Sequence, residues 1–280
     1  MDAVQQAKAR LRAADAILIG AGAGFSAAAG LTYSGERFTR HFQPFIQRYG
    51  MTDMYSAAFY PFASEEEKWA YWAEHIWINR FAPPALPLYR QLLAVVQDKP
   101  YFVITSNVDG QFAKAGFAPD KLFAVQGDYG QLQCATPCHA QVYDNQAQVR
   151  QWRAQQEDCR IPAALVPVCP RCGGRMAMHL RVDQRFVQTM SWHEAQQRYA
   201  AFATQALHGH TVYLELGVGF NTPGIIRYPF EQMTFRNTHA TLIRLNRDHP
   251  VGLAETAART IALREDPNAV LAQWLQENEE

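Results

Sequence analysis

Four of the five cysteines in this 280-residue chain form two close pairs, which is the spacing of metal ligands. Three residues separate Cys134 from Cys138, and two separate Cys169 from Cys172. Short loops with proline and glycine let both thiolates of a pair turn toward one tetrahedral Zn²⁺. The long segment between the pairs is acceptable, because the cost of closing a loop grows slowly with its length. Four cysteine ligands leave no open coordination position, so the sequence predicts a structural zinc site.

Some details of the cysteines leave alternatives open. The four residues could be buried or free thiols, although their paired spacing disfavours this. His139 follows Cys138 directly and could compete as a ligand. Cys159 has no partner at ligand spacing and is expected to be a small core residue. The odd number of cysteines, in a chain that shows no secretory signal, argues against a disulfide framework.

A glycine-rich turn, Gly20-Ala-Gly-Ala-Gly24, follows a short apolar run at residues 16–19. Glycine lacks a Cβ atom, so the backbone of such a turn can approach a phosphate closely. The spacing Gly22-x-Gly24-x-x-Ala27 fits the dinucleotide-binding fingerprint only in its relaxed form, and a plain tight turn explains it about as well. A dehydrogenase also needs a carboxylate about 20 residues later, and residues 38–47 contain none. A nucleotide therefore fits this turn, whereas hydride transfer is not favoured.

Polar or glycine residues also follow the other predicted strands. The apolar runs at 101–105, 122–125, 211–216 and 241–245 precede Ser106-Asn107-Val108-Asp109, Gln126-Gly127, Gly217-Val218-Gly219 and Asn246. A weaker strand is expected at 260–263, before a C-terminal helix at 267–276. Short strands separated by helical patterns predict βαβ units, and hence a parallel sheet with helices on both faces. Ligands bind at the carboxyl edge of such sheets, so these polar residues mark the expected site.

Residues 33–95 differ from the rest of the chain, with many aromatic and few β-branched residues. A capping box, Ser64-x-x-Glu67, predicts the start of a helix. This helix carries apolar residues at helical spacing, namely Trp69, Trp72, Ile76 and Phe81. The stretch predicts a helical insert after the first strand. Its aromatic stripe could form a wall for an acyl or lipoyl group, but this spacing is more typical of a core.

The charge balance excludes several classes of function. The chain has 26 basic and 26 acidic residues, so its formal net charge of zero offers no general attraction for nucleic acid or anionic lipid. Hydrophobic residues make up 48% of the chain, which is enough for a large core. No apolar run reaches the roughly 18 residues of a membrane span. We therefore expect a folded cytoplasmic protein without nucleic-acid or membrane partners.

The order of these motifs resembles the sirtuin family, NAD-dependent enzymes with a Rossmann-like large domain and a small zinc-bearing domain. The resemblance covers about residues 14–265, and its most specific parts are Asn107-Val108-Asp109 and the four-cysteine module. It implies an α/β fold with a Rossmann-like parallel sheet, a helical insert and a small zinc module with four cysteine ligands. The implied boundaries are 1–32, 96–130 and 180–280 for the large domain, 33–95 for the insert and 131–179 for the zinc module.

The resemblance also implies roles for individual residues. Asn107 would position the nicotinamide ribose, Asp109 would contact the carboxamide, and Gln126 stands where the family has its catalytic base. The glycine turn would line the pyrophosphate, and Asn246 would contact the adenosine ribose. The residues expected to hold NAD are Gly22, Ala23, Gly24, Phe25, Ser26, Arg37, Ser106, Asn107, Asp109, Gln126, Gly217, Val218, Gly219, Asn221 and Asn246.

The sequence departs from the family pattern at several of these positions. The family's Pro-Asp-Phe-Arg segment is absent, and Arg37 would serve in a shifted register. The Thr-Ser pair of the phosphate site is Val218-Gly219, and the glutamine before the catalytic asparagine is Ser106. Above all, Gln126 replaces the histidine that acts as general base.

This last replacement changes the expected reaction. Glutamine can hydrogen-bond a ribose hydroxyl but has no group that titrates near neutral pH. Loss of a general base typically lowers the rate about 10²–10⁴-fold, so deacylation would be impaired. Cleavage of the glycosidic bond depends on positioning and charge stabilisation and can survive the change. Gln126 therefore predicts mono-ADP-ribosyl transfer from NAD to a protein acceptor, with release of nicotinamide.

Gln126, the glycine turn and residues 216–224 resemble the microbial macrodomain-linked branch of the sirtuins. That branch is associated with mono-ADP-ribosylation of a lipoyl-carrier protein related to the glycine-cleavage H protein. The resemblance implies such a carrier as acceptor and a macrodomain hydrolase as counterpart. Two alternatives remain open. One is an NAD-dependent protein lysine deacylase in which another group replaces the base, and the other is a catalytically silent NAD-binding module.

Overall fold

The computed structural model describes residues 2–276 and contains a six-stranded parallel sheet in the order β3-β2-β1-β7-β8-β9. The strands are β1 (Ala16–Ala21), β2 (Tyr101–Thr105), β3 (Leu122–Ala124), β7 (Thr211–Leu216), β8 (Thr241–Leu245) and β9 (Thr260–Leu263). Every strand predicted from the sequence is confirmed. The chain runs outward from β1 to β3 and then returns to β7 on the other side of β1. This makes the β1–β7 pair a topological switch point, where open α/β sheets bind ligands.

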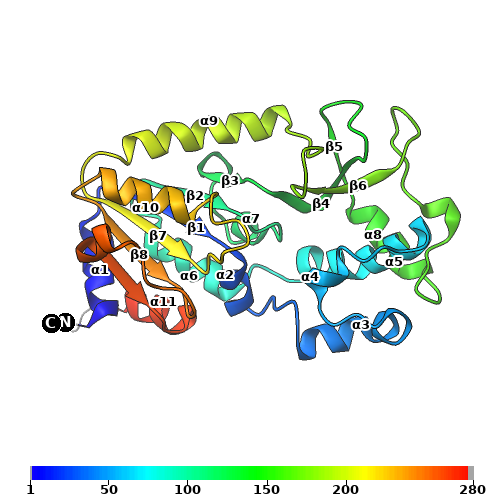
Figure 1. Ribbon diagram of the computed structural model, residues 1–280, viewed down its shortest axis with the longest axis horizontal. Coiled ribbons are helices and arrows are strands. Elements are labelled where there is room, and N and C mark those ends of the chain that lie inside the picture. Colours follow the sequence, from blue (N-terminus) through cyan, green and yellow to red (C-terminus); the bar gives the residue numbers. More distant parts are fainter. Residues whose placement is uncertain (1, 277–280) are drawn as a thin grey trace.

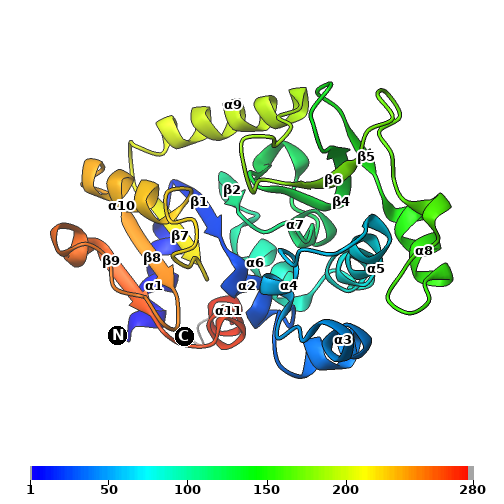
Figure 2. The same cartoon turned by 45° about the vertical axis from the view of Figure 1, so that its right-hand side comes forward.

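Helices cover both faces of this sheet (Figures 1 and 2). One face is covered by α1 (Ala3–Ala13), α6 (Pro87–Val96), α7 (Gln111–Lys114) and α11 (Pro267–Leu275). The other is covered by α9 (Met190–Gln205) and α10 (Arg227–Arg236). Successive strand side chains alternate between the two faces, so Ile17 and Ile19 belong to the first core and Leu18 to the second. No helix within residues 2–276 is long and apolar enough to cross a membrane.

The predicted insert is helical. Its predicted bounds, 33–95, contain α3 (Glu36–Tyr49), α4 (Met54–Ala57), α5 (Glu65–Ile76), a π-helical turn η1 (Trp77–Phe81) and most of α6, which packs against the parallel sheet. The predicted helix start is confirmed, because Ser64 Oγ accepts a hydrogen bond from Glu67 N at 3.2 Å. The Glu67 carboxylate accepts in return from Ala63 N, one residue before Ser64, at 3.3 Å. Trp69 and Ile76 have no exposed surface and Trp72 is 6% exposed. The aromatic stripe is therefore core, as its helical spacing indicated.

A second, three-stranded antiparallel sheet was not predicted. It has the order β5-β4-β6 and consists of β4 (Gly127–Cys134), β5 (Val142–Asp144) and β6 (Met176–Leu180). It packs with α8 (Gln146–Gln155) and the insert around one shared core, in which Trp69 meets Trp152 at 5.1 Å between ring centroids. Figures 1 and 2 show this second lobe beside the parallel sheet.

The second lobe crosses the boundaries implied by the family resemblance. Strand β4 begins at Gly127, before the implied limit at 130, and β6 ends at Leu180, just after the limit at 179. The division of the chain into domains remains a prediction. The remaining short elements are α2 (Ala23–Ala28), η2 (Pro119–Lys121), η3 (Ala163–Leu165) and η4 (Ala254–Arg259).

Candidate active site at the carboxyl edge of the sheet

The turns that follow β1 and β7 lie directly against each other at the switch point. Gly22 N donates to Leu216 O and Gly24 N donates to Gly217 O, each at 2.9 Å. A Cβ atom on Gly22 or Gly24 would lie 2.8 Å from the Gly217 oxygen, and Gly217 itself has a φ of +59°. Contact between the two turns therefore requires glycine at all three positions. This agrees with the reading of the first turn as a tight strand-to-helix connection.

Asn107 and Asp109 belong to one buried hydrogen-bond network beside this turn. Asn107 Nδ2 donates to Gly22 O at 3.0 Å and to the Tyr89 hydroxyl at 3.3 Å. Ser26 Oγ donates to Asp109 Oδ2 at 2.5 Å and lies 2.7 Å from the Tyr89 hydroxyl. Asn107 is 8% exposed and Asp109 is 5% exposed. The structure thus brings together four of the predicted site residues, Gly22, Ser26, Asn107 and Asp109.

Tyr89 connects this network, and the sequence analysis missed it. It lies on α6, where its spacing with Leu88 and Leu92 is that of a core position. Burial raises the pKa of its hydroxyl well above the ordinary value, so the group acts as a neutral donor and acceptor. Phe25 was predicted to contact the cofactor, but it has no exposed surface. Its ring meets Tyr89 edge-on at 4.8 Å, which is a core position.

The segment that carries Gln126 runs alongside the segment that carries Asn107 and Asp109. Val125 N donates to Thr105 O at 3.1 Å, and Tyr129 N donates to Val108 O at 2.9 Å. Gln126 lies between these two hydrogen bonds, so its backbone is fixed next to residues 105–109. The backbone arrangement brings the three predicted catalytic residues to the same edge of the sheet. Their roles remain predictions.

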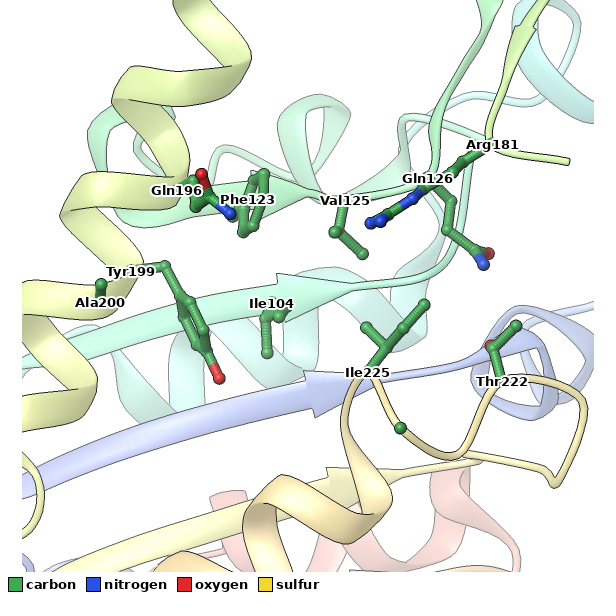
Figure 3. Close-up of a pocket in the computed structure, with 11 residues that line it drawn as sticks. Ile104, Phe123, Val125, Gln126, Arg181, Gln196, Tyr199, Ala200, Thr222 and Ile225 are labelled. Carbon is green, nitrogen blue, oxygen red and sulfur yellow. The ribbon is translucent and has the colours of Figure 1, made fainter. Parts of the chain in front are cut away.

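Gln126 also lines a pocket of about 600 Å³ between α9 and the sheet (Figure 3). Apolar side chains form most of its wall, and polar groups lie at its two ends. The lining residues are Ile104, Phe123, Val125, Gln126, Arg181, Gln196, Tyr199, Ala200, Thr222, Gly224 and Ile225.

Arg181 brings a positive charge to the end of the pocket where Gln126 lies. Its backbone N donates to Gln126 O at 3.0 Å. This hydrogen bond connects the residue directly after β6 to Gln126. The sequence analysis missed Arg181, since no local pattern distinguishes it. Burial raises the pKa of Tyr199 to about 12, so this side chain is not a base near neutral pH. The pocket therefore contains no group that accepts a proton readily at neutral pH.

Asn246 joins the loop after β8 to the turn after β7. Its Nδ2 donates to Val218 O at 2.8 Å, and its Oδ1 accepts hydrogen bonds from Asp248 N and His249 N at 3.1 and 2.9 Å. These contacts use both ends of the amide. Val218 is buried, whereas the neighbouring Gly219 and Asn221 are exposed. A contact of these residues with an adenosine ribose remains a prediction.

Arg37 is engaged inside the insert. Its guanidinium donates to Thr32 O at 2.8 Å, Ile78 O at 2.7 Å and Asn79 Oδ1 at 2.9 Å. Through these three hydrogen bonds Arg37 connects the segment before α3 to η1. Ser106 lies at the sheet edge, where its N donates to Ala21 O at 3.1 Å. The cofactor contacts of Arg37 and Ser106 remain predictions.

The two predicted cysteine pairs converge in the second lobe. The Sγ atoms of Cys134, Cys138, Cys169 and Cys172 all lie within 4.8 Å of one another. The Cys134–Cys172 and Cys138–Cys169 sulfur distances are both 3.7 Å. Thiolates are soft ligands with the tetrahedral preference of zinc sites, so this group could hold a metal ion.

The two remaining candidates near the cysteine cluster have other contacts. His139 Nε2 lies 2.6 Å from the Tyr143 hydroxyl, and its Nδ1 lies 3.0 Å from Cys138 Sγ. The histidine therefore packs beside the cluster and is not one of the four converging ligands. Cys159 is 7% exposed, as expected for a core residue.

Replacing Asp109 with asparagine is expected to raise the melting temperature at neutral pH by a few degrees. Burial, more than any other factor, raises the pKa of Asp109 above its ordinary value of 3.8. The folded protein therefore binds this proton more tightly than the unfolded chain. The free energy of unfolding of the unaltered protein, relative to that of the variant, therefore falls as the pH rises from 3.8 through the raised pKa of Asp109. Thermal unfolding of both proteins from about pH 4 to pH 8 measures this difference.

Asp53 provides the control for this experiment. Hydrogen bonds from Ser56 hold the pKa of Asp53 below its ordinary value, so the sign is opposite. The stabilisation that the ionised Asp53 carboxylate provides is fully present at a pH above its ordinary pKa. This stabilisation is lost as the pH falls through the lowered pKa. Asp53→Asn should therefore destabilise the protein at neutral pH. An Asp109→Asn difference that does not grow with pH would contradict the assignment.

Comparison with known proteins relates the whole chain to one family. A protein ADP-ribosyltransferase of Staphylococcus aureus is 37% identical over 267 residues, which cover 94% of this chain and 84% of the relative. A probable bifunctional ADP-ribose hydrolase/ADP-ribosyltransferase of Fusarium oxysporum f. sp. cubense is 34% identical over 242 residues, which cover 81% of this chain and 39% of that protein. No protein-family model matches the chain.

Solved structures show the same fold at lower identity. The structure of a Sir2 homologue in complex with NAD has a TM-score of 0.62 at 15% identity and covers 98% of this chain and 92% of that one. A Sir2 enzyme studied for its mechanism and regulation has a TM-score of 0.59 at 18% identity, with 98% and 96% covered. The fold is therefore that of the sirtuins. The chain belongs to the sirtuin family, in the branch that includes the Staphylococcus aureus protein ADP-ribosyltransferase.

Proposed function

We propose that the protein is an NAD-dependent protein mono-ADP-ribosyltransferase that releases nicotinamide. The observation that carries this proposal is that residue 126, beside the Asn107–Asp109 segment, is a glutamine. Its side chain has no titratable group, whereas the family resemblance places the catalytic base of the deacylation reaction at this position. NAD supplies the ADP-ribosyl group, since its bond from ribose C1′ to nicotinamide breaks as C1′ bonds to a nucleophile of the acceptor. The identity to the Staphylococcus aureus protein ADP-ribosyltransferase supports the same reaction class.

The residues at the switch point fit NAD. Within the two turns Ala23, Gly24 and Gly219 are exposed at the carboxyl edge, and a Cβ on Gly219 would meet nothing within 4 Å. Asn107 and Asp109 offer a fixed amide and a fixed carboxyl group beside these turns. In the proposed complex the two turns hold the pyrophosphate, and Asn107 and Asp109 hold the nicotinamide end. Their hydrogen bonds to Gly22, Ser26 and Tyr89 orient them before the substrate binds.

The side chains around Gln126 explain why we favour transfer over deacylation. Deacylation needs a base for a ribose hydroxyl, but the polar side chains of the pocket beside Gln126 are two amides, a guanidinium, a threonine hydroxyl and a tyrosine with a pKa of about 12. Asp109 is buried and hydrogen-bonded to Ser26, so it is not free to take a proton from the pocket. A nucleophile supplied by the acceptor protein removes the need for that base.

We further propose that the four-cysteine cluster holds Zn²⁺ in a structural role. Its four sulfur ligands leave no position for water or substrate. Cys134, the last residue of β4, pairs with Met176, the first residue of β6. The cluster therefore lies at the end of the second lobe where the pairing of these two strands stops. The metal would therefore hold together strands that are far apart in the sequence.

We infer that the acceptor is a lipoyl-carrier protein and that a macrodomain-type hydrolase reverses the modification. The motif resemblance supports the carrier. The hydrolase is supported by the Fusarium oxysporum relative, whose name joins ADP-ribose hydrolase and ADP-ribosyltransferase in one protein. The direct test incubates the protein with labelled NAD and lipoylated or unlipoylated carrier, followed by intact-mass analysis. One added ADP-ribose on the carrier, with equimolar nicotinamide, is expected. NAD binding without nicotinamide release under any acceptor condition would refute the transferase.

Gln126→His is expected to raise deacylase activity at least about tenfold, because it restores a group that titrates near neutral pH. The measurement is release of O-acyl-ADP-ribose from an acylated peptide, by mass spectrometry. The control is Gln196→His, which places a histidine in the same pocket on α9. That control should leave deacylation unchanged. Robust O-acyl-ADP-ribose release by the unaltered protein would instead favour the deacylase.

A further inference from the structure

Four charged side chains are buried together between α10 and the strands β7 and β8. Glu215 and Arg244 are direct neighbours across the two strands, and Arg227 and Glu231 come from α10. Arg244 Nη2 lies 2.9 Å from the carboxylates of both Glu215 and Glu231, and Arg227 Nη1 lies 3.4 Å from Glu215. None of the four is more than 6% exposed. Two cations and two anions can stay buried because each has a partner, so the cluster connects α10 firmly to the sheet.

Both arginines also donate to the loop after β8, at residues 246–251. Arg227 donates from Nη1 to His249 O at 3.1 Å and from Nη2 to Val251 O at 3.0 Å. Arg244 Nη1 donates to the same Val251 oxygen at 3.0 Å. Hydrogen bonds from buried charged donors are stronger than neutral ones, so they hold this loop in place.

The ring of Phe220 lies against the outer side of this cluster. Its centroid is 4.5 Å from Arg227 Cζ, and the His249 ring meets it edge-on at 4.9 Å. These contacts fix the ring, yet Phe220 is 50% exposed. Isolated exposed aromatic residues are common on protein surfaces. This one is distinctive because it lies just after the turn that we assign to the pyrophosphate and touches the loop of Asn246, which we assign to the adenosine ribose.

We propose that Phe220 stacks on the adenine ring of NAD. This inference rests on the proposed function, because it requires NAD at this edge of the sheet. Aromatic side chains bind nucleic-acid bases through stacking of their flat faces. The contacts with Arg227 and His249 hold the ring before the ligand arrives, so little side-chain entropy is lost on binding. The open space beside Gly219 leaves the turn accessible next to the ring.

The test measures the binding of ADP-ribose to Phe220→Ala by isothermal titration calorimetry. The dissociation constant should rise about ten- to hundredfold, the range expected for one lost stacking contact. The KM for NAD should rise by a similar factor while kcat for nicotinamide release changes less than about twofold, because the adenine end takes no part in bond cleavage. Phe220→Tyr keeps the aromatic face and should bind nearly as well as the unaltered protein. Phe235→Ala removes an exposed ring of α10 and serves as the matched control.

The outcomes separate this inference from the function on which it rests. If the unaltered protein binds ADP-ribose and Phe220→Ala binds it equally well, stacking by Phe220 is refuted and the transferase proposal stands. Equal weakening in Phe220→Ala and Phe220→Tyr would also refute stacking, because tyrosine retains the ring. If the unaltered protein binds neither ADP-ribose nor NAD, the proposed function itself fails.

Discussion

Replacing Asn107 with alanine should abolish nicotinamide release, with a loss of at least about 10²–10³-fold, while the protein stays folded. The amide is held in one orientation at the sheet edge, since Nδ2 donates to Gly22 O at 3.0 Å and to the Tyr89 hydroxyl at 3.3 Å. Alanine removes this group and leaves the Gly22 carbonyl without its side-chain donor. Because the group is held before the substrate binds, we expect kcat to fall more than KM rises.

The matched control for this variant is Asn237→Ala. Asn237 is also a buried asparagine, with 3% exposure, and its Nδ2 donates to Ala206 O at 3.3 Å and Gly209 O at 3.2 Å. It therefore reports the general cost of losing a buried amide away from the site. Both variants should lower the melting temperature, but only Asn107→Ala should lose nicotinamide release by chromatographic assay. Retained activity in Asn107→Ala would remove this residue from the mechanism.

The second large effect is expected in the four-cysteine cluster, which we propose to hold zinc. Cys169→Ser should lose the bound metal and destabilise the second lobe by several kcal/mol, because structural zinc contributes on the order of 10 kcal/mol of binding free energy in small metal-dependent domains. Cys169 is 1% exposed, and its N donates to Gly174 O at 2.7 Å within the loop that carries Cys172. Serine keeps the size of the side chain but is a poor ligand for zinc. Elemental analysis and thermal unfolding measure the two effects.

Cys159→Ser provides a control in the same lobe. Cys159 is buried in the same core as Cys169 but is not part of the four-cysteine cluster. This variant should retain about one zinc per chain and respond to a chelator as the unaltered protein does. Absence of zinc from the unaltered protein, together with an unchanged melting temperature in Cys169→Ser, would refute the metal site.

The parallel sheet could be predicted from local sequence alone. Its four central strands, β2, β1, β7 and β8, are short apolar runs buried on both faces, and each is followed by glycine or polar residues. The helical insert was predictable for a similar reason, since a capping box and helical spacing are properties of neighbouring residues. The cysteine pairs were visible because metal ligands recur at fixed short spacings.

The antiparallel sheet of the second lobe was not predictable in this way. Its central pairing joins Gln133 and Cys134 to Ala177 and Met176, more than 40 residues later. No local pattern records such a partner, and the burial of these strands depends on α8 and the insert. The same reason explains the missed site residues. Tyr89 and Arg181 lie in different elements from the residues they contact, and neither carries a motif of its own.

The sequence by itself determined the order of the parallel strands along the chain, the residues at their carboxyl ends, the two cysteine pairs, and the presence of glutamine at position 126. These features depend on residue type and on spacing over a few positions. Only the tertiary structure decided that Tyr89 connects Ser26 to Asn107, that the second lobe places Arg181 beside Gln126, and that a buried charge cluster supports Phe220. Those contacts join residues far apart in the chain, and their geometry exists only once both cores have packed.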